Sequence, residues 1–262
     1  MDNPWIDART HGQGEGSKMG MRWQVAVESS QDAAAAVRAG AVALELQQGA
    51  PERVRAICTQ VRHQADGILI SVSLPAPRSP AALQASLQPL REAGVDRVAV
   101  PLGEAATAAS LLRLLAGASW RGGEAGGPVL MPVLSLPGGV VSPDAVGRLE
   151  ALVSLALRES VQALVIDLDA GASDPGAIWR ARPVPARVPR LIRTLQRAGI
   201  EVGVRVTTGR QDLARLLDWG ADFATLACWE RDARGERVLD VDRLLERLRD
   251  PRTPQQRVPL AG

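Results

Sequence analysis

Lysine is almost absent from this sequence. Lys18 is the only one, so every other member of the 31 Lys and Arg residues is arginine. An arginine side chain stays protonated at ordinary pH and cannot act as an amine nucleophile. A mechanism that passes through a lysine imine therefore has a single candidate. That candidate lies in a Gly-rich polar segment that we expect to lie outside the core.

Cysteine and long apolar runs are also scarce. Cys58 and Cys228 lie far apart in apolar stretches, and no CxxC pair or Cys/His cluster occurs. This pattern fits a reducing cytosol better than a disulfide framework. No apolar run approaches the roughly 18 residues that cross a bilayer, and the N-terminus has no apolar signal region. We therefore expect a soluble protein of the reducing cytoplasm.

An excess of one charge is lacking as well. The 31 Lys and Arg residues face 29 Asp and Glu residues, which gives a net charge of +2. Such a balance produces no strong field of either sign. We therefore predict neither nucleic acid nor a membrane surface as a partner.

What the sequence does contain is a regular alternation of short apolar strands and amphipathic helices. The predicted strands are Trp23–Glu28, Ala41–Gln47, Gly67–Leu74, Arg97–Leu102, Val129–Leu136, Ala163–Asp169, Glu201–Thr207 and Asp222–Cys228. The predicted helices are Gln31–Ala39, Pro51–Gln64, Pro80–Ala93, Glu104–Leu115, Pro143–Arg158, Val188–Ala198, Gln211–Leu217 and Val241–Leu248. Alternation of this kind indicates parallel pairing of the strands.

Eight such units in 262 residues, 46% of them hydrophobic, predict an α/β fold of the (β/α)8 TIM-barrel type in one domain. We place the barrel at residues 21–250, with a disordered tail at 1–20 and a flexible tail at 251–262. An open doubly wound sheet is the alternative. It would carry a Gly-rich phosphate turn after its first strand, and Ala26–Gln31 contains no glycine.

The sixth predicted strand carries two carboxylates at its end. Side chains alternate along a strand, so Asp167 and Asp169 share a face with Ala163 and Val165, and the branched residues take the other face. Branched residues outward and small residues inward are typical of a barrel strand. The same reasoning predicts which residues face inward, and many of them are polar, which is unusual for a barrel interior. The predicted inward-facing residues are Gln24, Ala26, Glu28, Ala43, Glu45, Gln47, Ser71, Ser73, Ala99, Pro101, Ser135, Asp167, Asp169, Gly203, Arg205, Thr207, Phe223, Thr225 and Ala227.

These inward groups predict a site at the carboxyl-terminal end of the strands, where barrel active sites lie. The candidate catalytic residues are Glu45, Asp167 and Asp169, acting as acids and bases. The candidates for binding substrate or phosphate are Arg205, Thr207, Thr208, Gln47 and Ser73. Arg205 should pair with an acid, because an unpaired buried charge costs roughly 3–5 kcal/mol. A purely structural ion-pair network is the alternative interpretation.

The loop at residues 171–187 follows the acidic strand on the same side of the barrel, and it contains Trp179, Arg180 and Arg182. Its place after a strand allows a lid over the site. A Pro-interrupted surface loop with an anchored Trp is an equally good interpretation.

The order of the motifs resembles the (5-formylfuran-3-yl)methyl phosphate synthase family of methanofuran biosynthesis. The likeness is carried by Val27–Leu46, Gly94–Leu102, Ala163–Asp169, Phe223–Cys228 and Gly235–Arg237. It implies a barrel enzyme that condenses triose phosphates through a lysine imine, with Glu45 and Asp167 at the positions of the family's acids. Gln47 and Ala99 stand where the family has lysines, and Gly171 falls near a further one. Glutamine and alanine cannot form an imine.

Two hypotheses follow. The first is a diverged lyase of one-carbon cofactor metabolism that binds a small phosphorylated substrate. The second is a non-catalytic barrel that partners an active homologue or another pathway enzyme. We predict a homo-oligomer or such a hetero-oligomer, and no cofactor or resident metal. Two clustered acids would suit Mg²⁺ if a metal were required.

Overall fold

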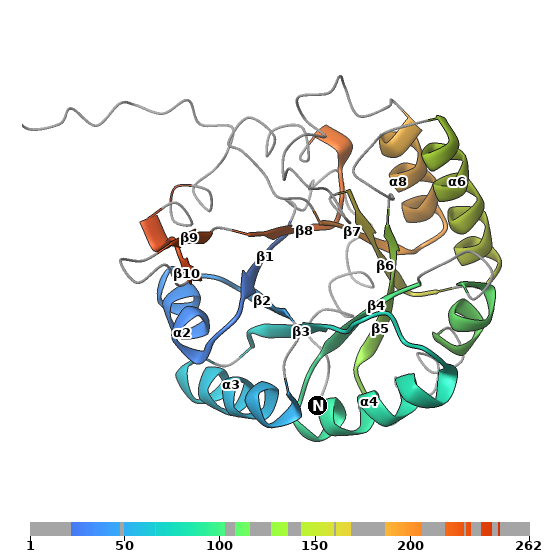
Figure 1. Cartoon of the computed structure of the whole chain (residues 1–262). Helices are drawn as coiled ribbons and strands as arrows, with labels where there is room; N and C mark the ends of the chain where they lie inside the picture. Colours follow the sequence, from blue (N-terminus) through green and yellow to red (C-terminus); the bar gives the residue numbers. More distant parts are fainter. Residues whose placement is uncertain are drawn as a thin grey trace, which may run out of the picture.

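The chain forms a closed ring of eight parallel strands wrapped by helices (Figure 1). The computed structural model describes residues 22–47, 50–65, 67–102, 108–115, 127–135, 143–159, 161–168, 187–205, 218–227, 229–231, 237–242 and 246. The strands of the barrel are β1 Arg22–Val27, β2 Ala43–Gln47, β3 Leu69–Ser73, β4 Arg97–Pro101, β5 Val129–Ser135, β6 Ala163–Asp167, β7 Glu201–Arg205 and β8 Phe223–Leu226. Each strand pairs with the next in sequence, and β8 pairs with β1 to close the ring. The predicted (β/α)8 barrel is therefore confirmed.

Helices cover the outside of the ring. They are α2 Ser30–Arg38, α3 Pro51–Gln64, α4 Pro80–Glu92, α6 Pro143–Arg158 and α8 Arg187–Arg197, with helical residues at 108–115 as well. The predicted bounds agree with those of the five labelled helices to within one residue. The predicted helix at 211–217, most of the one at 241–248, both tails and nearly all of the loop at 171–187 lie outside the described residues. None of the described helices is long and apolar enough to cross a membrane.

The alternation of side chains along the strands separates two apolar clusters. The outer cluster packs strands against helices, and its members Val25, Leu44 and Ile70 are fully buried. The inner cluster fills the middle of the barrel and consists of Ala99, Met131, Val133, Ala163, Val165 and Phe223. Small and large side chains together thus make a solid layer inside the barrel, as is usual for closed parallel strands.

Similar turns lead into β4 and β8, four strands apart. Gly94 and Gly220 end the preceding helical segments with φ of 74° and 73°, a conformation that glycine adopts without strain. Two residues later, the Asp96 carboxylate accepts a hydrogen bond from the backbone N–H of Ile70 at 2.7 Å. The Asp222 carboxylate accepts one from Val202 N–H at 2.8 Å. Each aspartate thereby anchors its strand to the strand before it.

A short antiparallel hairpin, β9 Trp229–Arg231 and β10 Arg237–Leu239, follows β8, where the sequence pattern predicts no separate strands. Asp32 in α2 holds it, because its Oδ1 accepts a hydrogen bond from the backbone N–H of Leu239 at 3.2 Å. The same carboxylate accepts a hydrogen bond from Ser29 Oγ at 2.7 Å, and Ser29 Oγ caps α2 by accepting from Asp32 N–H at 3.0 Å. One buried carboxylate therefore joins the start of α2 to the hairpin.

Candidate functional site

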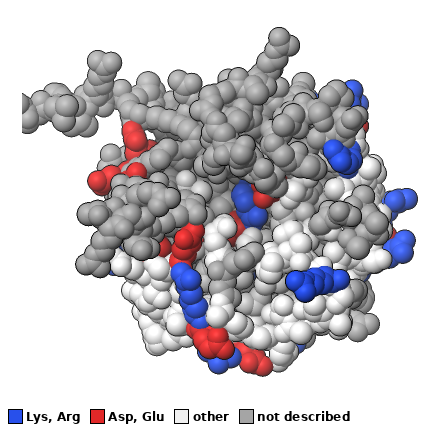
Figure 2. Space-filling model, in the orientation of Figure 1, with Lys and Arg blue, Asp and Glu red and all other residues white. Residues whose placement is uncertain are grey.

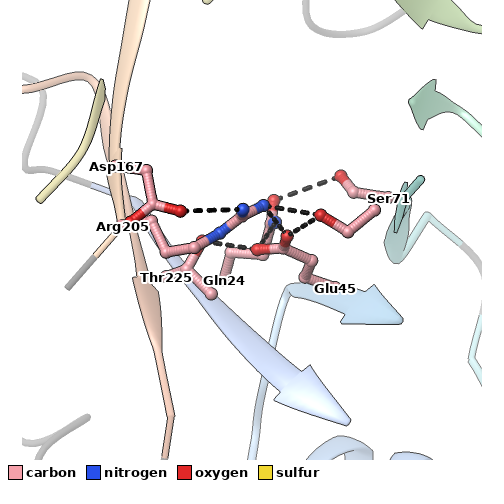
Figure 3. A network of polar contacts seen from close by, with 7 residues as sticks. Gln24, Glu45, Ser71, Asp167, Arg205 and Thr225 are labelled. Carbon is pink, nitrogen blue, oxygen red and sulfur yellow. Dashed lines mark hydrogen bonds and ion pairs between the residues drawn. The ribbon is translucent and has the colours of Figure 1, made fainter. Parts of the chain in front are cut away.

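Seven polar side chains from six strands meet inside the barrel toward the carboxyl-terminal ends of the strands (Figure 3). We call this group the mouth network. Its members are Gln24 on β1, Glu45 on β2, Ser71 and Ser73 on β3, Asp167 on β6, Arg205 on β7 and Thr225 on β8. All of them occupy positions that the strand alternation predicts to face inward. The pairing of β1 with β2 places residue 24 near residue 45, and closure of the ring through β8 and β1 brings residue 225 to the same place.

Glu45 is the most enclosed acid of the mouth network, with 1% of its side chain exposed. It accepts hydrogen bonds from Gln24 Nε2 at 3.0 Å, Ser73 Oγ at 3.0 Å and Thr225 Oγ1 at 2.7 Å. It also forms an ion pair with Arg205. Four donors therefore fix both carboxylate oxygens, which is how a buried carboxylate is kept stable.

Arg205 joins the two acids. Its Nη2 contacts Glu45 and donates to Ser73 Oγ at 2.8 Å, and its Nη1 lies 3.4 Å from Asp167 Oδ2. Burial alone would lower the pKa of Arg205, but the neighbouring Glu45 and Asp167 carboxylates raise it above its ordinary value. The guanidinium therefore stays charged. The prediction that Arg205 pairs with an acid is confirmed.

The three charged groups of the mouth network differ in their access to solvent. The side chain of Glu45 is 1% exposed, that of Asp167 is 13% exposed and that of Arg205 is 19% exposed. With all three ionised, the two acids and one arginine sum to a charge of −1. A molecule entering from the mouth would thus meet Asp167 and Arg205 first. Basic and acidic side chains lie together near the middle of the face in Figure 2.

One donor of the network has no acceptor among the described residues. Arg205 Nε is buried and makes no hydrogen bond in the part of the chain that the structure describes. Buried polar atoms are nearly always satisfied, often by water or a ligand oxygen. This atom therefore marks a place where a bound oxygen would complete the network.

Of the predicted site residues, the structure brings together Glu45, Ser73, Asp167 and Arg205. Gln47 lies two residues after Glu45 on β2 and is opposite Ser73 in the pairing of β2 with β3. Asp169, Thr207 and Thr208 lie outside the described residues. Gln24, Ser71 and Thr225 were predicted to face inward but were not among the predicted site residues. The sequence indicated these residues only by their inward-facing positions. In the structure, Ser71 Oγ donates to Gln24 Oε1 at 3.2 Å and so orients the amide that donates to Glu45.

A second ion-pair cluster lies at the amino-terminal end of the barrel and was not predicted. Glu201 pairs with Arg22, and with Arg97 through Nη1 at 3.0 Å and Nη2 at 2.9 Å. The Arg97 guanidinium also lies 5.4 Å from the centre of the Phe223 ring. These groups begin β1, β4 and β7, at the end of a barrel that serves stability.

Other reactive groups do not form a site among the described residues. No three His, Cys, Asp or Glu side chains in this part of the chain are placed to hold a metal ion. Cys58 is buried in α3, and burial raises the pKa of its thiol to about 11. It is therefore a neutral apolar side chain near pH 7 and not a nucleophile. The mouth network is the candidate site.

Comparisons with known proteins identify the architecture. No family model matches the chain, and no curated protein matches it. Among solved structures, it is similar to phosphoribosyl anthranilate isomerase from Thermotoga maritima, at 12% identity over 88% of this chain and 98% of that one, with a TM-score of 0.59. It is also similar to an HpcH/HpaI aldolase/citrate lyase family protein from Burkholderia cenocepacia, at 17% identity over 94% and 97%, with a TM-score of 0.58.

A third neighbour is 2,3-dimethylmalate lyase, at 11% identity over 80% of this chain and 76% of that one, with a TM-score of 0.55. The neighbours thus include barrel enzymes of the aldolase and lyase type. At identities this low, the likeness establishes the fold.

Proposed function

We propose that this chain is a lyase-type barrel that binds a small phosphorylated carbonyl compound at the mouth network, where Asp167 transfers a proton. The observation that carries the proposal is the buried network around Arg205. Burying one arginine and two acids is often no more stabilising than apolar packing of the same volume. Such a cluster at the carboxyl-terminal end of a barrel, where barrel active sites lie, is therefore best explained by a role in binding or catalysis.

Within the mouth network, the two acids receive different roles. Glu45 is held by four donors and is 1% exposed, so we assign it to fixing Arg205. Asp167 is more exposed and approaches Arg205 at 3.4 Å. A carboxylate in this position can remove a proton from the carbon beside a carbonyl group. The resulting enolate attacks the aldehyde carbon of a second molecule, and the new alkoxide then takes a proton.

Acid and base chemistry also agrees with what the chain lacks. Lys18 is the only lysine, and Gln47 and Ala99 stand at positions where the resembled synthase family has lysines. We therefore propose a reaction of the methanofuran pathway, or of related one-carbon cofactor metabolism, that proceeds without an imine. The correspondence of Glu45 and Asp167 with the family's acids supports this assignment.

The phosphate of the substrate is assigned to the segment after β7. Barrels frequently bind phosphate with the loops that follow strands seven and eight, and Thr207 and Thr208 follow β7 in sequence. The name of one structural neighbour, phosphoribosyl anthranilate isomerase, refers to a phosphorylated sugar. Two carboxylates already neutralise Arg205, so we expect Arg205 to contribute to phosphate binding less than the hydroxyl and backbone groups do.

The test is proton exchange and condensation with triose phosphates. The purified chain is incubated in D₂O with dihydroxyacetone phosphate and glyceraldehyde 3-phosphate, and deuterium incorporation and product mass are followed. Asp167→Asn should lower the exchange rate by about 10²- to 10⁴-fold, the usual contribution of a general acid or base. Asp218→Asn, which changes an exposed carboxylate, is the matched control and should leave the rate unchanged. If the wild-type chain neither binds these triose phosphates nor catalyses exchange, the proposal is refuted.

A second candidate function is a non-catalytic barrel subunit. The observation that favours it is the completeness of the contacts around Glu45, together with the residues that stand at the lysine positions of the family. Under this hypothesis, the chain should form a stoichiometric complex with a lysine-bearing family member when the two are co-expressed. Native mass spectrometry would detect it. A chain that forms only homo-oligomers and turns over triose phosphates by itself would exclude this function.

A further inference from the structure

Helix α8 has two sharply different sides. Val188, Ile192 and Leu195 are fully buried against the barrel. Arg190, Arg193 and Arg197 are exposed. Residues spaced by three and four positions lie on one face of a helix. The three guanidinium groups therefore form one outward row, which we call the α8 arginine face, and it runs about 10 Å along the helix axis at 1.5 Å per residue.

The α8 arginine face is not neutralised by the described residues around it. Helix α8 contains no Asp or Glu. The neighbouring helix α6 offers Glu150, which lies 3.6 Å from Arg187 near the start of α8. Arg190, Arg193 and Arg197 make no ion pair with any residue that the structure describes.

Helix α6, which lies beside α8, carries two arginines and two acids, so it leaves the net positive charge of the α8 arginine face unchanged. Exposed arginines Arg148 and Arg158 lie on α6, and Figure 2 shows basic side chains on the side of the molecule where Figure 1 places α6 and α8. Other arginines on the barrel differ in this respect: Arg55 of α3 lies 3.3 Å from Glu92, whereas the exposed Arg53 of the same helix makes no ion pair with a described residue. What distinguishes α8 is that three exposed arginines share one face of a helix that contains no acid, and none of the three forms an ion pair with a described residue.

We propose that the α8 arginine face is a docking surface for an acidic segment of a partner protein. A guanidinium group binds carboxylates with two parallel hydrogen bonds, so a row of three such groups suits a segment with repeated Asp or Glu. Nucleic acid fits less well, because its binding proteins carry broad basic surfaces and this chain has a net charge of only +2. The surface lies on an outer helix, and its role is independent of chemistry at the mouth network.

The experiment measures binding of a fluorescein-labelled oligoglutamate of about 15 residues to the full chain by fluorescence anisotropy at low and at physiological salt. The variant Arg190→Glu/Arg193→Glu should weaken binding at least tenfold. The control variant Arg53→Glu/Arg55→Glu makes the same charge change on α3, on a different part of the barrel, and should stay within about twofold of the wild type. Circular dichroism verifies that both variants fold.

Three outcomes would overturn the proposal: no binding by the wild-type chain, an equal loss in both variants, or tighter binding of a single-stranded oligonucleotide or of anionic vesicles than of the acidic peptide. Asp167→Asn is included in the same assay. It should bind the peptide normally, so a failure of the proposed function and a failure of this docking surface would be seen separately.

Discussion

Inside the barrel, the ring of Phe223 fills the volume that a side chain at Gly203 would need. They face each other in the pairing of β7 with β8. A Cβ atom on Gly203 would lie 2.2 Å from both Cε2 and Cζ of the Phe223 ring. The chain contains a single phenylalanine, and the absence of a side chain at residue 203 is what lets this ring fill the centre of the barrel. The ring in turn supports Arg97 at the amino-terminal end.

Gly203→Ala should therefore destabilise the fold by about 1–3 kcal/mol, the usual cost of overpacking a core. The matched control is Gly147→Ala in α6, where an added Cβ meets no atom within 4 Å. That change should be neutral or stabilise by up to about 1 kcal/mol, because alanine favours helix. Urea unfolding measures the free energy of unfolding of both variants. Adding Phe223→Leu to Gly203→Ala should recover part of the loss, and equal effects of the two glycine changes would contradict the account.

At the scale of elements, the turns before β4 and β8 connect a helical segment to the next strand in the same way. A glycine with positive φ reverses the chain, a buried residue follows, and an aspartate then accepts a backbone N–H from the preceding strand. Asp96 also pairs with Arg62 of α3 at 2.6 Å. Each aspartate thus satisfies an N–H at the start of a parallel ladder and sets the register of two strands.

Asp96→Ala and Asp222→Ala should each lower the free energy of unfolding by about 1–2 kcal/mol, because each leaves a strand N–H without its acceptor. The double variant should lose close to the sum, since the two turns lie four strands apart and share no partner. Urea unfolding provides the measurement. Arg62→Ala separates the ion pair from the backbone contact at Asp96 and should cost less than Asp96→Ala. A double variant no weaker than either single one would show that the turns do not act independently.

At the scale of the whole molecule, the barrel interior is layered by charge. An ion-pair layer of Arg22, Arg97 and Glu201 closes the amino-terminal end. The apolar cluster around Met131 and Phe223 fills the middle. The mouth network occupies the other end. In these barrels one end serves stability and the other carries function.

Two variants should separate the ends of the barrel. Glu201→Gln removes the carboxylate that holds Arg97 in two hydrogen bonds, so it should cost about 3 kcal/mol of stability and leave binding of triose phosphate unchanged. Asp167→Asn leaves Arg205 paired with Glu45 and should cost about 1 kcal/mol while it impairs binding or exchange. Thermal unfolding and calorimetric titration test both. Loss of ligand binding in Glu201→Gln at a temperature where it is folded would contradict this division.

The sequence by itself determined the order of eight strand and helix units and the face of each strand that points inward, because side-chain alternation is a local property of the backbone. It also predicted that Arg205 must have an acidic partner, since a buried charge cannot remain uncompensated. It did not reveal the support that Gln24, Ser71 and Thr225 give to Glu45, nor the Glu201 cluster. Those contacts depend on ring closure and strand register, which bring residues 24, 45 and 225 to one level of the barrel. Only the tertiary structure decided which inward groups touch and which acid stays within reach of solvent.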